Sequence, residues 1–473
     1  MDHATLKPFG FDLDRAAKTP LSEQIRQGIA DAIRRGVLQP GDRLPSWQDL
    51  ASQLGVARGT VQVAYEKLNA EQLVVASQSS GTRVARRLDR IDPDKALWPS
   101  GAFFETYVEM TRGPAAFQMG VPSRDVYPAK LLSRIHNRAV RRENSSPLLY
   151  PDPRGEPELR REIAAYLAVA RGIQCSPSQV LITSGFSAGL GLAINVLGLA
   201  GQSAWVENPG FPWTRHALQL SNIKICPVPV DKDGARIDLG INMFPNAKAA
   251  ILTPGQQAPL GYPLSIERRK SLIEFAKERD VWVLEDDYLG ELQLEGRTPP
   301  ALASIDNHGR VVHLGTFSKT LSPTLRLGFL VAPAGLTERF IEFAACLAPP
   351  PSAALQLAIA EFMHEGHYLR HLRRIRRTYG ARRTALLECL RSTFDPSTVT
   401  AAGLAVLLAL PDQLHDVSVA ERARAFGMAP SPLSRWCAEG TEPKNALILS
   451  SATTPTTDLA SYCTRLHRII QGT

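Results

Sequence analysis

The sequence predicts a chain of two parts: an N-terminal winged helix-turn-helix, helical with a small β wing, and a large α/β domain that ends in a small α+β subdomain. Three observations predict it. Two short helical patterns joined by a Gly-containing turn precede two β-prone runs within the first 85 residues. Beyond residue 117, short apolar runs alternate with helical stretches, as in a mainly parallel sheet covered by helices. Chemically distinctive residues follow each of these runs.

Length and composition are those of a soluble multidomain protein. A chain of 473 residues exceeds a typical single domain and predicts two to four domains. Hydrophobic content of 44% with 21% charged residues is ordinary for globular proteins. No apolar run reaches about 18 residues, and the N-terminus lacks the charged-then-apolar order of a signal peptide. We therefore expect a cytoplasmic protein without membrane contact.

The cysteines and the net charge narrow the possible ligands. Six cysteines are scattered without a Cys-x-x-Cys pair, which argues against a disulfide framework or a zinc site, so no metal is expected. The net charge of +8 and the pI near 9.2 permit a polyanionic partner, although a solvated basic surface gives the same numbers.

The first 85 residues, here called the head, carry three helical patterns. Leu21 begins an amphipathic pattern that Gly36 closes. A second helix fits Trp47–Leu54, with Ser46 as its N-cap. A third runs from about residue 58 to residue 71 and, as the second helix of a helix-turn-helix, has the position of a helix that enters a major groove.

A β-hairpin wing follows the third helix. Leu73–Val75 and Thr82–Val84 are β-prone runs, and residues 77–81 join them with Ser, Gln and Gly. The head has a net charge close to zero, because it contains ten Lys and Arg against nine Asp and Glu. Non-specific affinity for DNA should therefore be modest, and dimerisation is needed for useful binding. A helical interaction module without a DNA role is the alternative.

The head resembles the winged helix-turn-helix of the GntR family over nearly its whole length. The run Leu-Gln-Pro-Gly-Asp-Arg-Leu-Pro-Ser at residues 38–46 carries the resemblance, together with Gly81-Thr82 in the wing. The resemblance implies binding of double-stranded operator DNA, with contacts from Ser46, Arg58, Gly59, Thr60 and Gly81. Trp47-Gln48 departs from the family, which has a small residue and an arginine there, so one phosphate contact is in doubt.

Residues 86–116 mix charge, Pro and Gly without periodicity and are predicted to be a linker. The large domain then spans residues 117–473, with the small subdomain at about 350–473. Its predicted strands are five apolar runs: residues 180–183, 203–206, 249–252, 281–284 and 311–314. Because ligands of such sheets lie at the carboxyl ends of the strands, the residues after each run are site candidates.

The residues after these runs suit pyridoxal 5'-phosphate. Lys319 lies between two apolar runs, where burial favours a neutral, nucleophilic amine. Thr316, Ser318 and Arg326 suit a phosphate. The cofactor also needs a carboxylate at its ring nitrogen, a phenol, a stacking aromatic ring and further phosphate donors, and all of these follow other runs. Each has an ordinary alternative, such as an exposed loop lysine or a core phenylalanine.

Order and spacing resemble the fold-type I pyridoxal phosphate enzymes, the aspartate aminotransferase superfamily. A GntR-like head joined to such a domain resembles the MocR group of bacterial transcriptional regulators. The resemblance implies that Lys319 is the catalytic-type residue that holds the cofactor as a Schiff base. It also implies that Asp286 pairs with the ring nitrogen, Tyr288 with the ring hydroxyl, and Phe211 with the ring face. The implied phosphate contacts are Phe186, Ser187, Thr316, Ser318 and Arg326.

The sequence departs from transaminases where they bind substrate. Ala258 stands where they have an asparagine, and residues 445–450 contain no arginine to clamp a substrate carboxylate, while Arg435 lies upstream. Ala405 stands where MocR proteins often have histidine. The basic run at residues 370–383 matches a helix of the small subdomain and is interpreted as a solvated face, with DNA contact as the alternative.

These observations favour a homodimeric transcriptional regulator whose large domain senses pyridoxal phosphate or an amino-compound effector. The alternative is an active pyridoxal phosphate-dependent aminotransferase that carries a DNA-binding domain, and a cofactor-free scaffold is a third possibility. The sequence gives neither the effector, the operator, nor the sign of regulation.

Overall fold

The computed structural model describes residues 13–71, 73–77, 81–85, 101, 103–104, 107–108, 115–294, 296, 299–441, 444–454 and 456–472. The chain divides into two compact units, Met1–Glu105 and Thr106–Thr473. Most of the predicted linker at residues 86–116 lies outside the described residues, so its limits stay a prediction.

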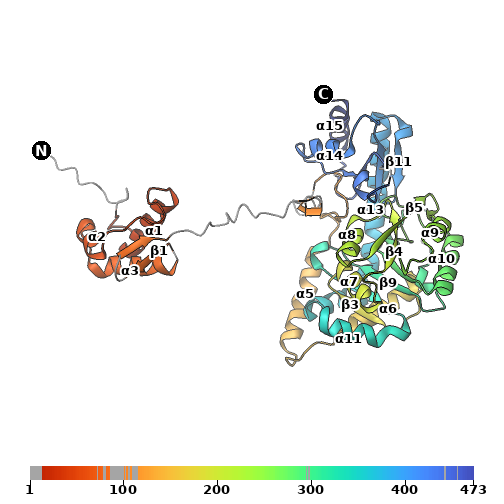
Figure 1. Cartoon of the computed structure of the whole chain (residues 1–473), viewed down its shortest axis with the longest axis horizontal. Coiled ribbons are helices and arrows are strands. Elements are labelled where there is room, and N and C mark those ends of the chain that lie inside the picture. The colour runs from red at the N-terminus through yellow and green to blue at the C-terminus, as the bar shows by residue number, and fades with distance from the viewer. Residues whose placement is uncertain are drawn as a thin grey trace. The chain divides into compact units, whose positions relative to one another are not determined.

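The head has the predicted winged helix-turn-helix architecture (Figure 1). Its elements are α1 (Leu21–Arg34), α2 (Trp47–Leu54), α3 (Arg58–Ala70), β1 (Val74–Ser77) and β2 (Gly81–Val84). The three helices bury a shared core in which Ile25, Ile29, Leu50, Val61 and Leu68 are fully enclosed. The two strands pair antiparallel. The predicted turn residues 78–80 lie outside the described part of the chain.

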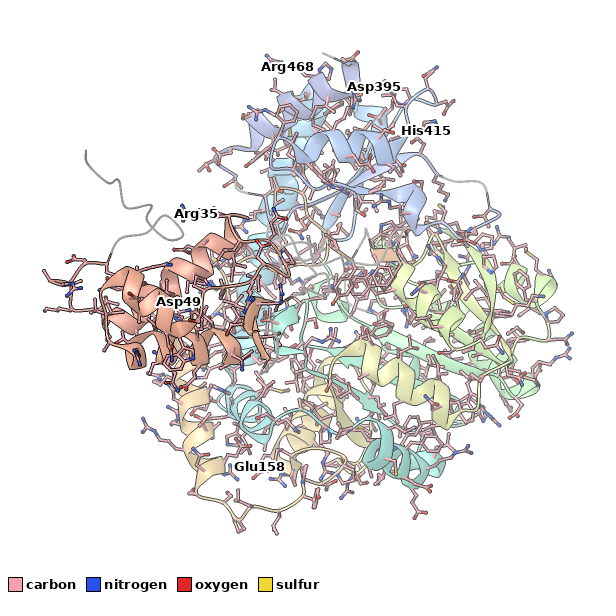
Figure 2. The ribbon with its side chains drawn as sticks, turned by 60° about the vertical axis from the view of Figure 1, so that its left-hand side comes forward. Arg35, Asp49, Glu158, Asp395, His415 and Arg468 are labelled. Atoms are coloured by element: carbon pink, nitrogen blue, oxygen red, sulfur yellow. The ribbon has the colours of Figure 1, made fainter. Side chains whose placement is uncertain are left out.

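Local signals set the limits of α2. The Ser46 hydroxyl oxygen accepts a hydrogen bond of 3.1 Å from the Asp49 backbone N–H, as predicted for an N-cap. Gly55 ends the helix in a left-handed conformation with φ of 62°. Asp49 and Arg35 are labelled on the head in Figure 2.

The second unit contains, among its described residues, an eight-stranded mixed sheet. The strands, in spatial order, are β3 (Val180–Thr183), β10 (Gly328–Val331), β9 (Val311–Thr316), β8 (Trp282–Asp287), β7 (Ala249–Leu252), β4 (Ser203–Asn208), β5 (Lys224–Asp231) and β6 (Gly234–Ala235). The run β9-β8-β7-β4-β5 is parallel, and β10 lies antiparallel between β3 and β9. All five predicted runs are strands. One detail differs: β8 continues through Asp287, so the three carboxylates at 285–287 belong to the strand and do not follow it.

Helices cover both faces of this sheet (Figure 1). They are α5 (Ala129–Asn144), α6 (Pro157–Ala170), α7 (Phe186–Val196), α8 (Pro212–Leu220), α9 (Ile237–Met243), α10 (Ile266–Arg279), α11 (Thr337–Leu347), α12 (Ala353–His364) and α13 (His367–Thr393). One core joins the sheet to α7, α8 and α11. Two others join it to α9 and α10, and to α5, α6, α12 and α13. The parallel strands β4, β7, β8 and β9 are therefore buried on both sides, which explains their continuous apolar sequence, whereas β5 alternates between buried and partly exposed residues.

The small C-terminal subdomain is α+β, as predicted. Its elements are β11 (Val399–Ala402), β12 (Ala405–Ala409), α14 (Asp416–Arg424), β13 (Ser431–Pro432), β14 (Ala446–Ser450) and α15 (Leu459–Gln471). The four described strands form an antiparallel sheet in the order β11-β12-β14-β13. Asp395, His415 and Arg468 mark its outer surface in Figure 2. Within the described residues, no helix is both long and apolar enough to cross a membrane.

Candidate functional site

One cavity of about 520 Å³ in the second unit gathers every residue that the sequence assigned to the cofactor. These residues are Phe186, Ser187, Phe211, Asp286, Tyr288, Thr316, Ser318, Lys319 and Arg326. They come from the segments that follow β4, β8 and β9, from the start of α7 and, for Arg326, from the turn before β10. The turn between β11 and β12 also lines the cavity, so it lies between the large sheet and the small subdomain.

Lys319 follows β9 and is bound by a backbone carbonyl group of a distant segment that also lines the cavity. Its Nζ donates a hydrogen bond of 2.9 Å to the carbonyl oxygen of Gly120. Burial lowers the pKa of the Lys319 amine, and the carboxylate of Asp286 opposes that shift. A neutral amine is the form that adds to a carbonyl group.

The three consecutive carboxylates of β8 point to alternate faces of the sheet, as the side chains of a strand do. Glu285 and Asp287 point to the same face of the sheet. Glu285 lies 2.9 Å from Nδ1 of His313 and accepts backbone N–H groups, and Asp287 accepts a hydrogen bond of 2.6 Å from Nε of Arg171. Both carboxylates thus have a buried side-chain partner, although Oδ1 of Asp287 has no hydrogen-bond partner within the described part of the chain. Asp286 points the other way, to the cavity.

Asp286 fits a cationic N–H group. Its side chain is buried, and its Oδ1 has no hydrogen-bond partner among the described residues. Burial raises the pKa of Asp286 well above its ordinary value, with further contributions from the charges of Asp287 and Glu207, while Lys319 opposes them. An unpaired buried carboxylate is costly, and a protonated ring nitrogen is a group that would relieve the cost.

The start of α7 and Arg326 lie next to each other in the cavity lining, in an arrangement suited to an anion. Gly185, with φ of 87°, precedes the helix, whose first backbone N–H groups have no partner within the helix. The guanidinium carbon of Arg326 lies 3.7 Å from where a Cβ on Gly185 would stand. Hydroxyl groups complete the cradle, since Thr316 Oγ1 donates to Ser318 Oγ at 3.0 Å.

Two rings lie at the remaining sides of the cofactor-sized space. Phe211 stands at the N-cap of α8 and lines the cavity. Tyr288 is half-buried directly after β8, and burial raises the pKa of its phenol. The phenol therefore stays protonated at neutral pH and can donate a hydrogen bond.

The predicted DNA-contacting residues of the head gather around α3 and the wing. Arg58 and Gly59 are exposed at the first turn of α3, and Thr60 there is half-buried. Gly81 opens β2 with φ of 77°, and the Arg43 guanidinium lies 3.2 Å from where a Gly81 Cβ would stand. Ser46 caps α2, so part of its hydrogen-bonding capacity is used within the head.

Two family descriptions match the chain. Residues 21–84 match the bacterial regulatory proteins of the gntR family, and residues 123–424 match aminotransferase class I and II. The chain is 33% identical over 437 residues to the probable rhizopine catabolism regulatory protein MocR of Rhizobium meliloti, which covers 89% of this chain and 88% of that protein. The chain belongs to the MocR group of GntR-family transcriptional regulators.

Further comparisons agree with this assignment. The HTH-type transcriptional regulator TauR of Rhodobacter capsulatus is 33% identical over 401 residues, covering 80% of this chain and 81% of TauR. Among solved structures, the kynurenine aminotransferase of Pyrococcus horikoshii superposes with a TM-score of 0.71 at 25% identity, covering 80% of this chain and 96% of that enzyme. This MocR-type regulator therefore carries an aminotransferase-like domain, a fold that implies pyridoxal phosphate binding.

Sequence reasoning assigned no role to three residues in or beside the cavity of this MocR-type regulator. Trp213 and Trp436 line the cavity itself, whereas Glu207 lines a smaller neighbouring pocket that shares Phe211 and Asp286 with it. Glu207 is buried and accepts hydrogen bonds from the Thr253 side chain and backbone, and burial raises the pKa of its carboxyl to about 7. Trp213 and Trp436 line the cavity from elements 223 positions apart. The Glu207 position could have been found from its place at the end of an apolar run, whereas the tryptophans are brought together only by the tertiary fold.

Proposed function

We propose that this regulator binds pyridoxal 5'-phosphate in the cavity, with Lys319 as its attachment point. We further propose that the occupied domain alters binding of the head to operator DNA, so that the cofactor or an amino-compound effector controls transcription. When bound, the cofactor would supply an electrophilic carbon that captures primary amines.

The observation that carries the cofactor proposal is the unpaired Oδ1 of Asp286 in the same cavity as Lys319. Glu285 and Asp287, on the other face of β8, are each bound to a buried protein side chain, His313 and Arg171, although Oδ1 of Asp287 also lacks a hydrogen-bond partner among the residues that the structure describes. Asp286 would hold a ring nitrogen protonated. Arg326 with the start of α7 would bind the phosphate.

The head supports the DNA proposal through its fold and through the exposure of its first recognition turn. Arg58 at the start of α3 is exposed and available to a phosphate or a base edge. The third helix of the head is the element that would enter the major groove.

A homodimer is supported by an exposed apolar loop. Leu148, Leu149 and Tyr150 have exposed fractions of 98%, 81% and 102%, although water is a poor environment for three large neighbouring side chains. Burial against a second copy would remove this cost. Two heads on one dimer would then read two half-sites.

An active aminotransferase is a second candidate because Lys319, Asp286 and Tyr288 are all in place. Turnover of an amino donor with a 2-oxo acid, lost in Lys319→Ala, would support it. Absence of turnover in a protein that holds the cofactor would rule out the aminotransferase and leave the regulator as the remaining candidate.

The regulator proposal is tested by fluorescence anisotropy with labelled DNA from the region upstream of the gene. We expect binding whose affinity changes when pyridoxal phosphate is added to the wild type, and does not change in Lys319→Ala. No binding with or without the cofactor would overturn the proposal. If the wild type binds the operator with the same affinity with and without pyridoxal phosphate, the proposal that the cofactor controls DNA binding is overturned.

A further inference from the structure

The strand β14 offers no cation to the cavity. Its five residues, Ala446–Ser450, are at most 5% exposed, and only Ser450 reaches the cavity lining. The transaminase resemblance places the arginine that binds an α-carboxylate on this strand. An α-amino acid bound through its amine near Lys319 would therefore find no guanidinium group at that place.

Two arginines line the same cavity from neighbouring elements. Arg435 belongs to the 3-10 helix η7 (Leu433–Trp436), which directly follows β13, the partner strand of β14. Arg424 ends α14 and is half-buried. The Arg435 guanidinium lies 3.8 Å from a carboxylate oxygen of Glu421, whose side chain is 55% exposed, so water weakens that ion pair. Arg424 and Arg435 thus both line the cavity, and both also interact with other parts of the protein.

Arg435 stands on a fixed support. The Arg215 side chain of α8 donates hydrogen bonds to the backbone carbonyl groups of Gly210, Arg435, Trp436 and Cys437 at 2.6 to 3.1 Å. The Gly210 N–H in turn donates to Trp436 O at 2.9 Å. These bonds join η7 to the loop that carries Phe211. The arginine end and the cofactor end of the cavity are therefore held in a set relation.

Aromatic rings connect Phe211, at the start of α8, with Trp436 of η7, the neighbour of Arg435. Phe211 contacts both Trp213 and Trp436, with centroids 5.9 Å apart in each pair. Tyr107 stacks on Trp213 at 5.3 Å. The Trp436 indole N–H donates to Ser431 Oγ at 3.0 Å, which fixes its ring. A ligand that reaches from Phe211 towards Arg435 would lie against ring faces, which favours an apolar or aromatic body.

A buried polar atom independently points to a ligand. Gln256 lines the cavity, is 5% exposed, and its Oε1 has no hydrogen-bond partner among the described residues. Its amide packs against the turn at Gly403, where a Cβ would stand 3.1 Å from the amide. Unsatisfied buried acceptors are rare and costly. The cavity volume of about 520 Å³ has to hold both the cofactor and the effector, and it falls in the range of about 300 to 1,000 Å³ for pockets that enclose drug-sized ligands.

We propose that the effector is a primary amine with an apolar, ring-sized body and an acidic group at its far end, bound by Arg435 and Arg424, with Gln256 accepting a hydrogen bond from it. This inference rests on the proposed function, since it takes Lys319 with pyridoxal phosphate as the amine-capturing end. Ordinary α-amino acids are not the preferred class, because β14 carries no arginine at the place where the transaminase resemblance puts the contact with an α-carboxylate.

Three amines test the proposal by titration into the cofactor-loaded, full-length protein, with the visible absorption of the cofactor as readout. Benzylamine has the body without the acid, 4-(aminomethyl)benzoate has both, and phenylalanine has its acid beside the amine. We expect the apparent Kd of 4-(aminomethyl)benzoate to be at least about tenfold lower than those of the other two, as one charged hydrogen-bonded contact supplies. Equal affinities, or tightest binding of phenylalanine, would overturn the proposal.

Variants assign the contact. Arg435→Gln should raise the apparent Kd of 4-(aminomethyl)benzoate about tenfold and leave that of benzylamine unchanged, which also shows that the variant is folded. Arg424→Gln should give a loss in the same direction. Arg422→Gln removes an exposed arginine of the same helix and should change neither amine. An undiminished preference for 4-(aminomethyl)benzoate in both Arg435→Gln and Arg424→Gln would contradict the assignment.

The outcomes separate the two levels of the argument. If the purified protein never acquires the cofactor absorption, the proposed function fails. If it acquires the absorption but the three amines act alike, only the effector class fails.

Discussion

Lys319 and Gly120, which both line the cavity, are joined by a hydrogen bond of 2.9 Å, although 199 positions separate them in the chain. Gly120 belongs to the segment that enters the second unit after the predicted linker. The same segment is attached to the small subdomain, because the Phe117 N–H donates to Thr454 Oγ1 at 3.0 Å and Phe117 bridges to Ser450. The Lys319 amine thus touches the stretch of chain that leads from the head into the cavity.

Removing this donor should loosen the segment. In Lys319→Ala the Gly120 carbonyl loses its partner, so we expect faster backbone hydrogen exchange in residues 115–122 than in the wild type. Hydrogen–deuterium exchange with mass spectrometry measures it on the full chain. Lys277→Ala, at an exposed lysine of α10, is the matched control and should leave these residues unchanged. Equal exchange in all three proteins would show that the contact does not hold the segment.

Asp286→Asn should change stability and cofactor affinity in opposite directions. The amide removes an unpaired buried carboxylate, so the free energy of unfolding without cofactor should stay equal or rise. The same change weakens the bond to a protonated ring nitrogen, and the Kd for pyridoxal phosphate should rise about 10- to 100-fold. Denaturant unfolding and cofactor titration measure the two effects. Asp412→Asn, at an exposed position, should alter neither, and unchanged cofactor affinity in Asp286→Asn would refute the assigned role.

Glu207 should make stability depend on pH near neutrality. Burial raises the pKa of its carboxyl from 4.5 to about 7, so the folded state holds a proton there that the unfolded state releases. This contribution is complete below pH 4.5 and is lost as pH rises through about 7. Its upper size is about 3 kcal/mol.

Denaturant unfolding at several pH values, on the wild type and on Glu207→Gln, isolates that contribution. The wild type should lose stability relative to Glu207→Gln as pH rises from 5 to 8, because the glutamine cannot ionise. Parallel curves for the two proteins would show that Glu207 does not carry a raised pKa.

The strands of the large sheet and the candidate cofactor-binding residues at their ends could be predicted from the sequence, because both depend on short-range patterns. Apolar runs of four residues mark strands that are buried on both faces, and polar residues at their ends follow from the parallel direction of the strands. Lys319 and Asp286 could be found in this way. Their roles toward the cofactor stay predictions.

Other features depend on contacts between distant segments and left no local signal. Nothing in the pattern of residues 328–331 distinguishes the antiparallel β10 from a parallel strand, and its place between β3 and β9 follows from packing. The pairing of Glu285 with His313 and of Asp287 with Arg171 likewise needs the register of β8 against β9 and the fold of α6. Without these partners, sequence could not show why Asp286 alone of the three carboxylates points to the cavity.

The head should lose DNA affinity evenly when Arg58 is removed. Arg58 is exposed at the first turn of α3, where its guanidinium group can contact a DNA phosphate. With such a contact, Arg58→Ala should weaken binding to operator and to unrelated DNA alike. The slope of log K against log salt concentration should then fall in magnitude by about 1. Anisotropy titrations at several salt concentrations measure both. Arg279→Ala, an exposed arginine at the end of α10, removes the same charge from the other unit and should leave the slope unchanged. A loss confined to the operator, with an unchanged salt slope, would instead assign Arg58 to a base edge, and no loss on either DNA would remove it from the interface.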